Sequence, residues 1–437
     1  MKLQPEMRQL QGGHIHRGLE RACSSSTEKS HTASPRSVLV IVSHVVQYAS
    51  PLFQILAADP RLDLHVAYCT LQGAERGWDH EFNIEVQWDE PLLNGYPWSE
   101  IPNKAAKPGL GRFFGLWNPG LWKLIRSGRF DAVVIYTGYM YASFWLAVAA
   151  AKSKGVAVLI SSDSTTLVSR DGSKWKRWLK PLILGSVYRT VDVLMSSAPA
   201  IRKLARTLGI PHDRIVDVGS GMNKEEWQGR AARFSRSDVR SAWNIPDDAH
   251  VVCYCAKLQE WKRPLDLVRA FAKAKLANAY LVMAGEGPQR AEVELAVDAL
   301  GIRERTRILG FVNASQLPAV YKASDLFVLP SWYDPCPLVV PEAMFSGLPV
   351  ILSDTILGRL HMIIEGKSGY IYRCGDTEQL AGILHEVLSN SQVLANLHSG
   401  VAEQMKQWTA QDFADSWMKA VETAVRRKKK NDGHGSI

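Results

Sequence analysis

Short apolar runs separated by longer stretches with helical spacing recur along the chain from about residue 36. In the first half, these runs are Val38–Val42, Leu64–Cys69, Asp131–Tyr136, Gly155–Ile160, Asp192–Ser196 and Arg214–Val218. Continuous apolar runs, in contrast to alternating ones, are typical of strands buried on both faces of a parallel sheet. Strands that alternate with helices predict a doubly wound α/β domain over residues 36–218.

The same pattern starts again after the polar stretch Lys224–Asp248, which is predicted as a linker and the first helix of a second domain. The predicted strands of this domain are Val251–Ala256, Leu281–Pro288, Thr306–Val312, Asp325–Leu329 and Leu348–Leu352. We therefore expect a second doubly wound domain over 219–406, followed by a last helix over 407–426. The length of 437 residues fits two domains.

Residues 1–35 are polar and rich in Ser, His and Gln, and they are predicted to be a disordered extension. Residues 427–437 are predicted to be a basic disordered tail. No apolar run reaches the ~18 residues of a membrane span, and no apolar segment marks a secretory signal. The 6 cysteines include no CxxC pair, which argues against a zinc site and indicates a reducing cytoplasm.

The net charge of +9 fits nucleic acid, an anionic membrane surface or an anionic substrate as a partner. No motif that reads nucleic acid is present, so we expect no nucleic acid partner. The stretch Gly172–Val191 holds basic residues, Trp175 and Trp178, and no acid, which is typical of a helix lying on an anionic membrane. An amphipathic helix with its tryptophans in the core, kinked or ended by Pro181, explains it equally well.

The stretch Gly77–Trp98 is dense in aromatic and acidic residues and is predicted to be a long loop. Loops of this length within a compact domain are usually functional. Aromatic rings suit the apolar faces of sugars or lipids, and packing against the domain wall is the alternative.

A loop, a helix and a strand follow Asp325–Leu329. The helix is predicted over Leu338–Ser346, with Gly347 as its C-terminal cap. The loop lies at the carboxyl edge of the predicted sheet, where open α/β folds bind ligands. Backbone N–H groups of Leu338 and Val339 open the helix and can hold an anion there.

Charged residues surround this helix start. Asp334 lies in the loop, and Glu342 lies eight positions later in the helix, so the two carboxylates can reach different parts of one extended ligand. Lys257 and Lys262 follow the strand Val251–Ala256 and lie next to the same loop. A turn-forming Asp334 and solvated positions for the other three residues are the ordinary alternatives.

The stretch resembles the signature of the retaining glycosyltransferases of family 4 in the GT-B class, P-S-x-x-E-x-x-G-L-x-x-x-E-A-M-x-x-G-x-P-V. The matching residues are Pro330, Ser331, Leu338, Glu342, Ala343, Met344, Gly347, Pro349 and Val350. The chain departs at Asp334, where the family has Glu, and at Pro337, where it has Gly. Residues 358–376 match a second family pattern, G-x-x-x-x-I-x-x-G-x-x-G-x-x-x-x-x-G-D. The resemblance is strong over about 250–376 and weak before 220.

The resemblance implies two Rossmann-like domains facing across a cleft, with the final helix crossing back to the first domain. It implies that Lys257 and Lys262 bind the phosphates of a nucleotide-sugar donor, Asp334 the transferred sugar and Glu342 the ribose. Lys257 stands where the family has Arg, which keeps the charge but loses the bidentate fork. Asp334 and Lys262 are the expected catalytic residues. No DxD pair is present, so we expect neither a metal nor another cofactor.

Gly285 lies in a glycine turn after a predicted strand and is expected at the donor site. The turn lacks the third glycine of a nicotinamide fingerprint. On the acceptor side, the family often has a glycine pair and a histidine that this chain does not show at matching positions. His44, Gly138 and Asp163, at the ends of predicted strands, are the candidates here.

The resemblance therefore implies a retaining, metal-independent hexosyltransferase acting on a glycan, lipid-linked or small-molecule acceptor. It is expected in the cytoplasm, or peripheral on the inner face of a membrane. An epimerase of the same fold, a nucleotide-sugar-binding protein without turnover, and a basic adaptor stay open as alternatives. The sequence names neither the donor sugar and base nor the acceptor.

Overall fold

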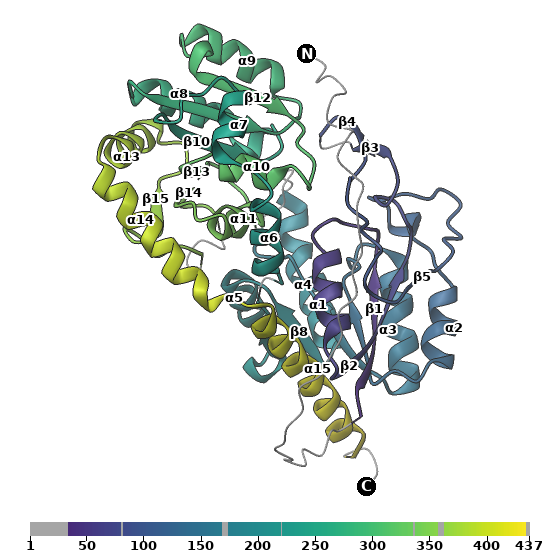
Figure 1. Cartoon of the computed structure of the whole chain (residues 1–437). Coiled ribbons are helices and arrows are strands. Elements are labelled where there is room, and N and C mark those ends of the chain that lie inside the picture. The colour runs from purple at the N-terminus through teal and green to yellow at the C-terminus, as the bar shows by residue number, and fades with distance from the viewer. Residues whose placement is uncertain are drawn as a thin grey trace, which may run out of the picture. The chain divides into compact units, whose positions relative to one another are not determined.

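The computed structural model describes residues 34–79, 82–167, 174–219, 221–334, 337–356 and 362–433, without the side chains of 174–177 and 431–433. The predicted extension over 1–35 lies outside the described residues except for its last two. Residues Pro35–Ile437 form one compact unit. It contains two parallel-sheet α/β domains (Figure 1), which confirms the predicted fold class, while the predicted domain bounds stay a prediction.

The first domain is built on a parallel sheet with strand order β5-β2-β1-β6-β7-β8-β9. Its strands are β1 (Arg36–Val42), β2 (Leu62–Tyr68), β5 (Trp98–Glu100), β6 (Ala132–Ile135), β7 (Ala157–Ser161), β8 (Val193–Ser196) and β9 (Ile215–Asp217). All except β5 were predicted, because each is a buried apolar run.

Helices cover both faces of this sheet, since its strands are apolar on both sides. One face packs against α2 (Gly120–Ser127), α3 (Ala142–Lys154), α4 (Lys174–Thr190) and α5 (Pro199–Thr207). The other face packs against α1 (Ser50–Ala58) and the C-terminal helix α15 (Ala410–Gly433). Leu39 and Ile41 therefore lie in one core, and Val38 and Val40 in the other, as the alternation of a strand requires.

The second domain is built on a parallel sheet with strand order β12-β11-β10-β13-β14-β15. Its strands are β10 (His250–Cys255), β11 (Ala279–Ala284), β12 (Thr306–Gly310), β13 (Leu326–Leu329), β14 (Val350–Ser353) and β15 (Gly369–Tyr372). One face packs against α8 (Pro264–Lys273), α9 (Arg290–Ala299), α13 (Thr377–Ser389) and α14 (Ser391–Gln404). The other face packs against α6 (Lys224–Ala231), α10 (Leu317–Lys322) and α11 (Val339–Phe345).

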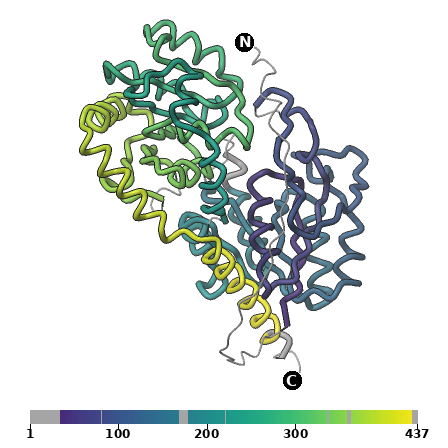
Figure 2. The backbone as a smooth tube through the Cα atoms, viewed as in Figure 1, coloured from purple at the N-terminus to yellow at the C-terminus, as the bar shows by residue number. Residues whose placement is uncertain are grey.

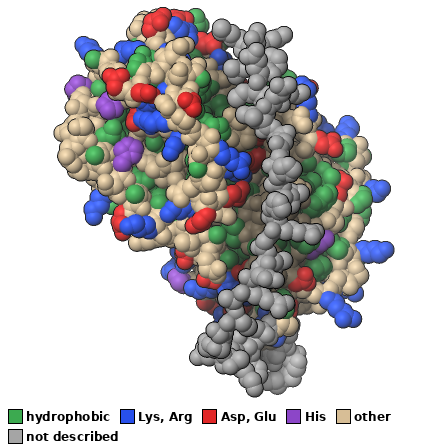
Figure 3. All heavy atoms as spheres, in the orientation of Figure 1, with side chains coloured by type: hydrophobic (Ala, Val, Ile, Leu, Met, Phe, Trp, Pro, Cys, Tyr) green, Lys and Arg blue, Asp and Glu red, His purple; other side chains and the backbone are tan. Residues whose placement is uncertain are grey.

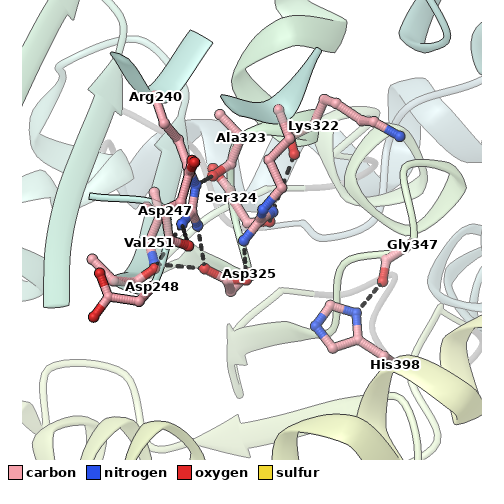
Figure 4. Close-up of polar contacts among 12 residues, drawn as sticks. Arg240, Asp247, Asp248, Val251, Lys322, Ala323, Ser324, Asp325, Gly347 and His398 are labelled. Atoms are coloured by element: carbon pink, nitrogen blue, oxygen red, sulfur yellow. Dashed lines mark hydrogen bonds and ion pairs between the residues drawn. The ribbon is translucent and has the colours of Figure 1, made fainter. Parts of the chain in front are cut away.

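A buried arginine fastens α7 (Arg236–Ala242) to the amino ends of β10 and β13 (Figure 4). Its guanidinium donates at 2.7 to 2.9 Å to the backbone carbonyl oxygens of Asp247, Ala249 and Ala323. Arg240 also donates to the Asp325 carboxylate at 2.7 Å, which accepts from the backbone N–H of Val251 at 2.8 Å. Burial lowers the pKa of Arg240, so its charge needs this full set of partners. The network stabilises the sheet edge opposite the carboxyl ends of the strands.

The final helix crosses back to the first domain, as predicted, and packs along β6 to β9 and α1 (Figures 1 and 2). Trp417 is fully buried there, and Asp415 pairs with Arg61 at 2.7 Å. The helix continues to Gly433, so the prediction of a disordered tail from 427 is wrong for its described part. Lysine and arginine are good helix formers and are favourable at a helix C-terminus, and Arg427 pairs with Asp213.

The aromatic stretch Gly77–Trp98 is not wholly a loop. It contains an antiparallel hairpin of β3 (Gly77–Asp79) and β4 (Ile84–Val86). Asn83 adopts a left-handed φ of 57°, which asparagine tolerates well, between the two strands. Strands this short, in which every residue except Val86 is exposed or half-buried, show no periodicity that the sequence could have revealed.

Candidate functional site

The loops that follow β10 and β13 meet at the carboxyl edge of the second sheet. The chain continues from β10 to β11 on one side, while β13 lies on the other, so the strand order reverses here. Lys257 and Lys262 follow β10, and Asp334 follows β13. The N–H of Trp332 donates to the carbonyl oxygen of Trp261 at 2.9 Å and ties the two loops together. Open α/β sheets bind ligands at such a position.

Lys262 and Asp334 form an ion pair in this crevice, between Nζ and Oδ2. Their side chains are 19% and 8% exposed. Because removing a lone carboxylate from water is costly, the lysine balances the charge of this nearly buried acid.

Glu342 lies in the first turn of α11 and accepts a hydrogen bond from the hydroxyl of Tyr321 at 3.0 Å. Burial raises the pKa of Glu342 to about 7, although this hydrogen bond and the charge of Arg230 both lower it. Its carboxyl group therefore changes charge near neutral pH.

The residues predicted to bind a donor line one cavity of about 490 Å³, within the usual range of small-molecule sites. They are Lys257, Lys262, Gly285, Asp334, Leu338, Val339 and Glu342. The structure thus brings all of them together, and their contacts with a donor stay a prediction.

The structure fixes where the helix α11 begins and why a glycine stands at position 285. Leu338 caps α11 and Val339 is its first residue, so the helix begins one position later than predicted. A Cβ at Gly285 would lie 2.0 Å from the carbonyl oxygen of Ala256. Glycine is therefore required there by the close approach of the chain, whether or not a ligand binds.

The predicted acceptor-side residues do not line the described part of this cavity. His44 is half-buried, its Nδ1 lies 2.9 Å from Oγ of Ser43, and burial lowers its pKa. Gly138 and Asp163 are exposed. A role for these three residues at an acceptor site stays a prediction.

Of the residues of the first domain that line the cavity, Phe82, Trp88 and Glu90 belong to the stretch Gly77–Trp98 that was predicted to be functional, but Gln47, Tyr48 and Pro51 were not predicted. The last three lie between β1 and α1 or at the start of α1. Oε1 of Gln47 is buried and has no hydrogen-bond partner in the described part of the chain. A buried acceptor in this state is available to a ligand hydroxyl. Their position after the end of β1 is the signal in the sequence that marks them, and it marks His44 equally.

Charge is spread over the surface. On the face drawn in Figure 3, acidic side chains lie among the lysines and arginines of the described residues. Within the described ranges, no group of three or more His, Cys, Asp or Glu side chains is placed to hold a metal ion. The helices of those ranges include none that is long and apolar enough to span a membrane.

Two family models match the chain, and they cover different domains. A glycosyl transferase 4-like domain matches residues 45–221, and a glycosyl transferases group 1 domain matches residues 235–408. The second match contains Lys257, Lys262, Asp334 and Glu342.

The chain also resembles individual proteins, at low sequence identity. An uncharacterized glycosyltransferase of Methanocaldococcus jannaschii is 30% identical over 188 residues, 43% of this chain and 48% of that protein. The chain thus spans about half the length of this relative. An alpha-monoglucosyldiacylglycerol synthase of Acholeplasma laidlawii is 22% identical over 338 residues, 75% of this chain and 83% of that protein.

The fold is shared with solved structures. Anabaena Alr3699/HepE, crystallised with UDP, superposes with a TM-score of 0.68 at 16% identity, over 89% of this chain and 100% of that chain. Both domains therefore agree in family and in fold, and the chain belongs to family 4 of the glycosyltransferases, in the GT-B class.

Proposed function

We propose that this chain is a hexosyltransferase that moves a sugar from a nucleotide-sugar donor to an acceptor with retention of configuration. The observation that supports this most is the shared cavity of Lys257, Lys262, Asp334 and Glu342 at the reversal of strand order. Charged groups spread along one cavity suit an extended ligand that carries a diphosphate, a sugar and a ribose.

In this proposal, Lys257 and Lys262 bind the diphosphate and stabilise the charge that grows on it as the glycosidic bond breaks. Two ammonium groups supply that charge, so the proposed reaction needs no metal. Asp334 faces the sugar, where its carboxylate stabilises the positive charge that develops at the anomeric carbon. The Lys262–Asp334 pair supports this arrangement, because it places a positive and a negative group side by side. As the bond breaks, negative charge grows on the diphosphate next to Lys262 and positive charge grows on the sugar next to Asp334.

Uridine nucleotides are the first donors to test, because Alr3699/HepE has been crystallised with UDP and with UDP-glucose. The family matches, the relatives and the similar solved structure give no support to an epimerase or to a binding protein without turnover.

The proposal predicts that at least one nucleotide-sugar raises the melting temperature of the protein. A ligand at 100 times its Kd adds about 2.7 kcal/mol of stability, which corresponds to a shift of several degrees. A panel of nucleotide-sugars and nucleoside diphosphates should be screened by thermal melting, and the stabilising donors then assayed for nucleoside diphosphate release. If neither stabilisation nor release occurs with any donor, the proposed function is wrong.

We further propose a peripheral location on an anionic membrane in the cytoplasm, with a lipid-linked acceptor. On α4, Trp178 is 81% exposed, so the alternative that this tryptophan faces the core is wrong, and the helix continues through Pro181. Leu179, Leu182 and Ile183 are exposed beside it. The similarity to an alpha-monoglucosyldiacylglycerol synthase supports the proposal of a lipid acceptor. Trp175 lies in the part of α4 whose side chains are not described.

Leu182→Ser is expected to reduce co-sedimentation with vesicles that contain anionic lipid, because it removes apolar area from the proposed membrane face. Binding of the wild type should fade with salt and require anionic lipid. Leu295→Ser is the matched control, since Leu182 and Leu295 are both 69% exposed and Leu295 lies on α9. Equal partitioning onto neutral and anionic vesicles, or onto neither, would remove the membrane proposal.

A further inference from the structure

Lys257 faces an anion from the other domain. Its Nζ lies 3.5 Å from Oδ2 of Asp79, the last residue of β3, and 4.3 Å from the ring centroid of Phe82. The Phe82 ring packs edge-on against Phe311, with centroids 5.1 Å apart. A cation that is proposed to bind the donor therefore rests against a carboxylate and an aromatic ring of the first domain.

The hairpin holds the Asp79 carboxylate in this orientation. Oδ1 accepts a hydrogen bond from the N–H of Phe82 at 2.9 Å, and the Asp79 carbonyl accepts from the N–H of Asn83 at 2.8 Å. One carboxylate oxygen thus belongs to the turn, and the other faces the lysine.

The segment after the hairpin is fastened to the second domain. The Asp89 carboxylate accepts hydrogen bonds from the N–H of Ser315 at 3.2 Å and from its hydroxyl. Asn313 Nδ2 donates to the carbonyl oxygen of Gln87 at 2.6 Å. Because these contacts keep the hairpin beside the cavity, they raise the effective concentration of Asp79 at Lys257.

We propose that Asp79 competes with the donor's diphosphate for Lys257, so that donor binding displaces a contact between the two domains. This inference rests on the proposed function. Both the carboxylate and the diphosphate are anions that pair with the same ammonium group, and Lys257 and Asp79 both remain partly accessible, 23% and 29% exposed. The donor prevails because it also contacts Lys262 and Glu342, and its binding loosens the hairpin from the second domain.

The test is calorimetric titration of wild type and Asp79→Asn with UDP and with inorganic pyrophosphate, which lacks base and ribose. Asparagine keeps an oxygen that can accept from the N–H of Phe82, so the turn contact is kept while the negative charge that faces Lys257 is removed. Asp79→Asn should bind both probes about threefold to fivefold more tightly, the range expected for a partly exposed ion pair. Unchanged or weaker binding of both probes by Asp79→Asn overturns the inference.

Glu85→Gln is the matched control, since it removes one negative charge from the same hairpin. Glu85 pairs with the exposed Arg76 at 2.5 Å and does not line the cavity. The affinity of the Glu85→Gln variant for UDP and for pyrophosphate should stay within about twofold of the wild type, as expected for a residue that does not interact with the site. Equal tightening in Glu85→Gln would mean that overall charge, and not the Asp79 contact, sets the affinity, and would overturn the inference.

A double-mutant cycle separates the contact itself from indirect effects. In a Lys257→Ala background, Asp79→Asn should tighten binding much less than in the wild type, because the lysine it competes for is gone and the 29% exposed carboxylate is screened by water. The same gain in both backgrounds overturns the inference while leaving the proposed function intact. If wild type and Asp79→Asn bind neither pyrophosphate nor any nucleoside diphosphate, the proposed function is wrong, and the inference falls with it.

Discussion

Lys262→Ala is expected to weaken the binding of the preferred nucleoside diphosphate by about 30-fold or more, equivalent to ~2 kcal/mol, through the loss of a charge-assisted contact. The structure adds a second cause. Lys262 is the ion-pair partner of Asp334, which is almost buried. Without the lysine, that carboxylate lies unbalanced in the cavity and repels the phosphates. Lys257→Ala should cost less, because Asp79 already competes for this lysine in the wild type and the carboxylate left behind is partly exposed.

These affinities should be measured by calorimetry with UDP, GDP and ADP at fixed ionic strength. Lys322→Ala is the control, since it removes the same charge from an exposed position at the end of α10. Adding Asp334→Asn to Lys262→Ala should recover part of the lost affinity by removing the unbalanced charge. Unchanged binding of all three nucleotides in both Lys257→Ala and Lys262→Ala would show that these residues do not bind phosphate.

The strands of both sheets were predictable because burial on two faces makes them continuous apolar runs. Val38–Val42 is such a run, and each of its residues is buried in the structure. The hairpin β3–β4 left no such trace, since its strands are short and largely exposed. The end of α15 was misplaced for another reason. A run of basic residues has the composition of a solvated tail, and the sequence does not show that Arg427 meets Asp213.

The convergence of the proposed donor residues in one cavity was predictable because they lie close to strand ends of one domain, and because Asp334, Leu338 and Glu342 lie within one family signature. The contribution of the segment between β1 and α1 was not predictable. Gln47 and Tyr48 reach the cavity through the packing of one domain on the other. Asp89 and Asn313 form a hydrogen bond across 224 positions of sequence, and no local pattern encodes such a pair. No sequence pattern therefore connects Asp79 with Lys257.

Asp334→Asn is expected to lower turnover by about 100-fold while leaving nucleotide affinity intact, because its carboxylate acts on charge that develops only in the transition state. The ion pair sharpens this expectation. Removing the charge of Asp334 frees Lys262 for the diphosphate, so UDP should bind as tightly as before or more tightly. Nucleoside diphosphate release should be measured across the donor panel, with hydrolysis standing in for transfer until an acceptor is known.

Glu342→Gln should do the reverse and raise the apparent constant for the donor with less effect on rate, since the ribose contact is the same in the ground and transition states. It also has a signature in pH. Burial raises the pKa of Glu342 from 4.5 to about 7, so its ionisation is harder in the folded chain. The stability of the protein without donor should fall as pH rises through this window, whereas donor affinity should rise as the carboxylate forms. Glu342→Gln should remove the part of both trends that this carboxyl group contributes.

The two substitutions are thus expected to have opposite kinetic effects, because Asp334→Asn lowers turnover and Glu342→Gln weakens donor binding. A merely structural role for either residue would not separate turnover from binding in this way. Release that continues at full rate in Asp334→Asn would keep the enzyme and remove this residue from the mechanism. Loss of nucleotide binding together with turnover in Asp334→Asn would indicate that the Lys262–Asp334 pair builds the site and does not act on the sugar. No release from the wild type with any donor, despite tight binding and an added extract that contains acceptors, would instead favour a protein that binds nucleotide-sugars without turnover. Asp334 and Pro337, the two departures from the family signature, would then be the first positions to change to Glu and Gly in a test of whether this loop prevents turnover.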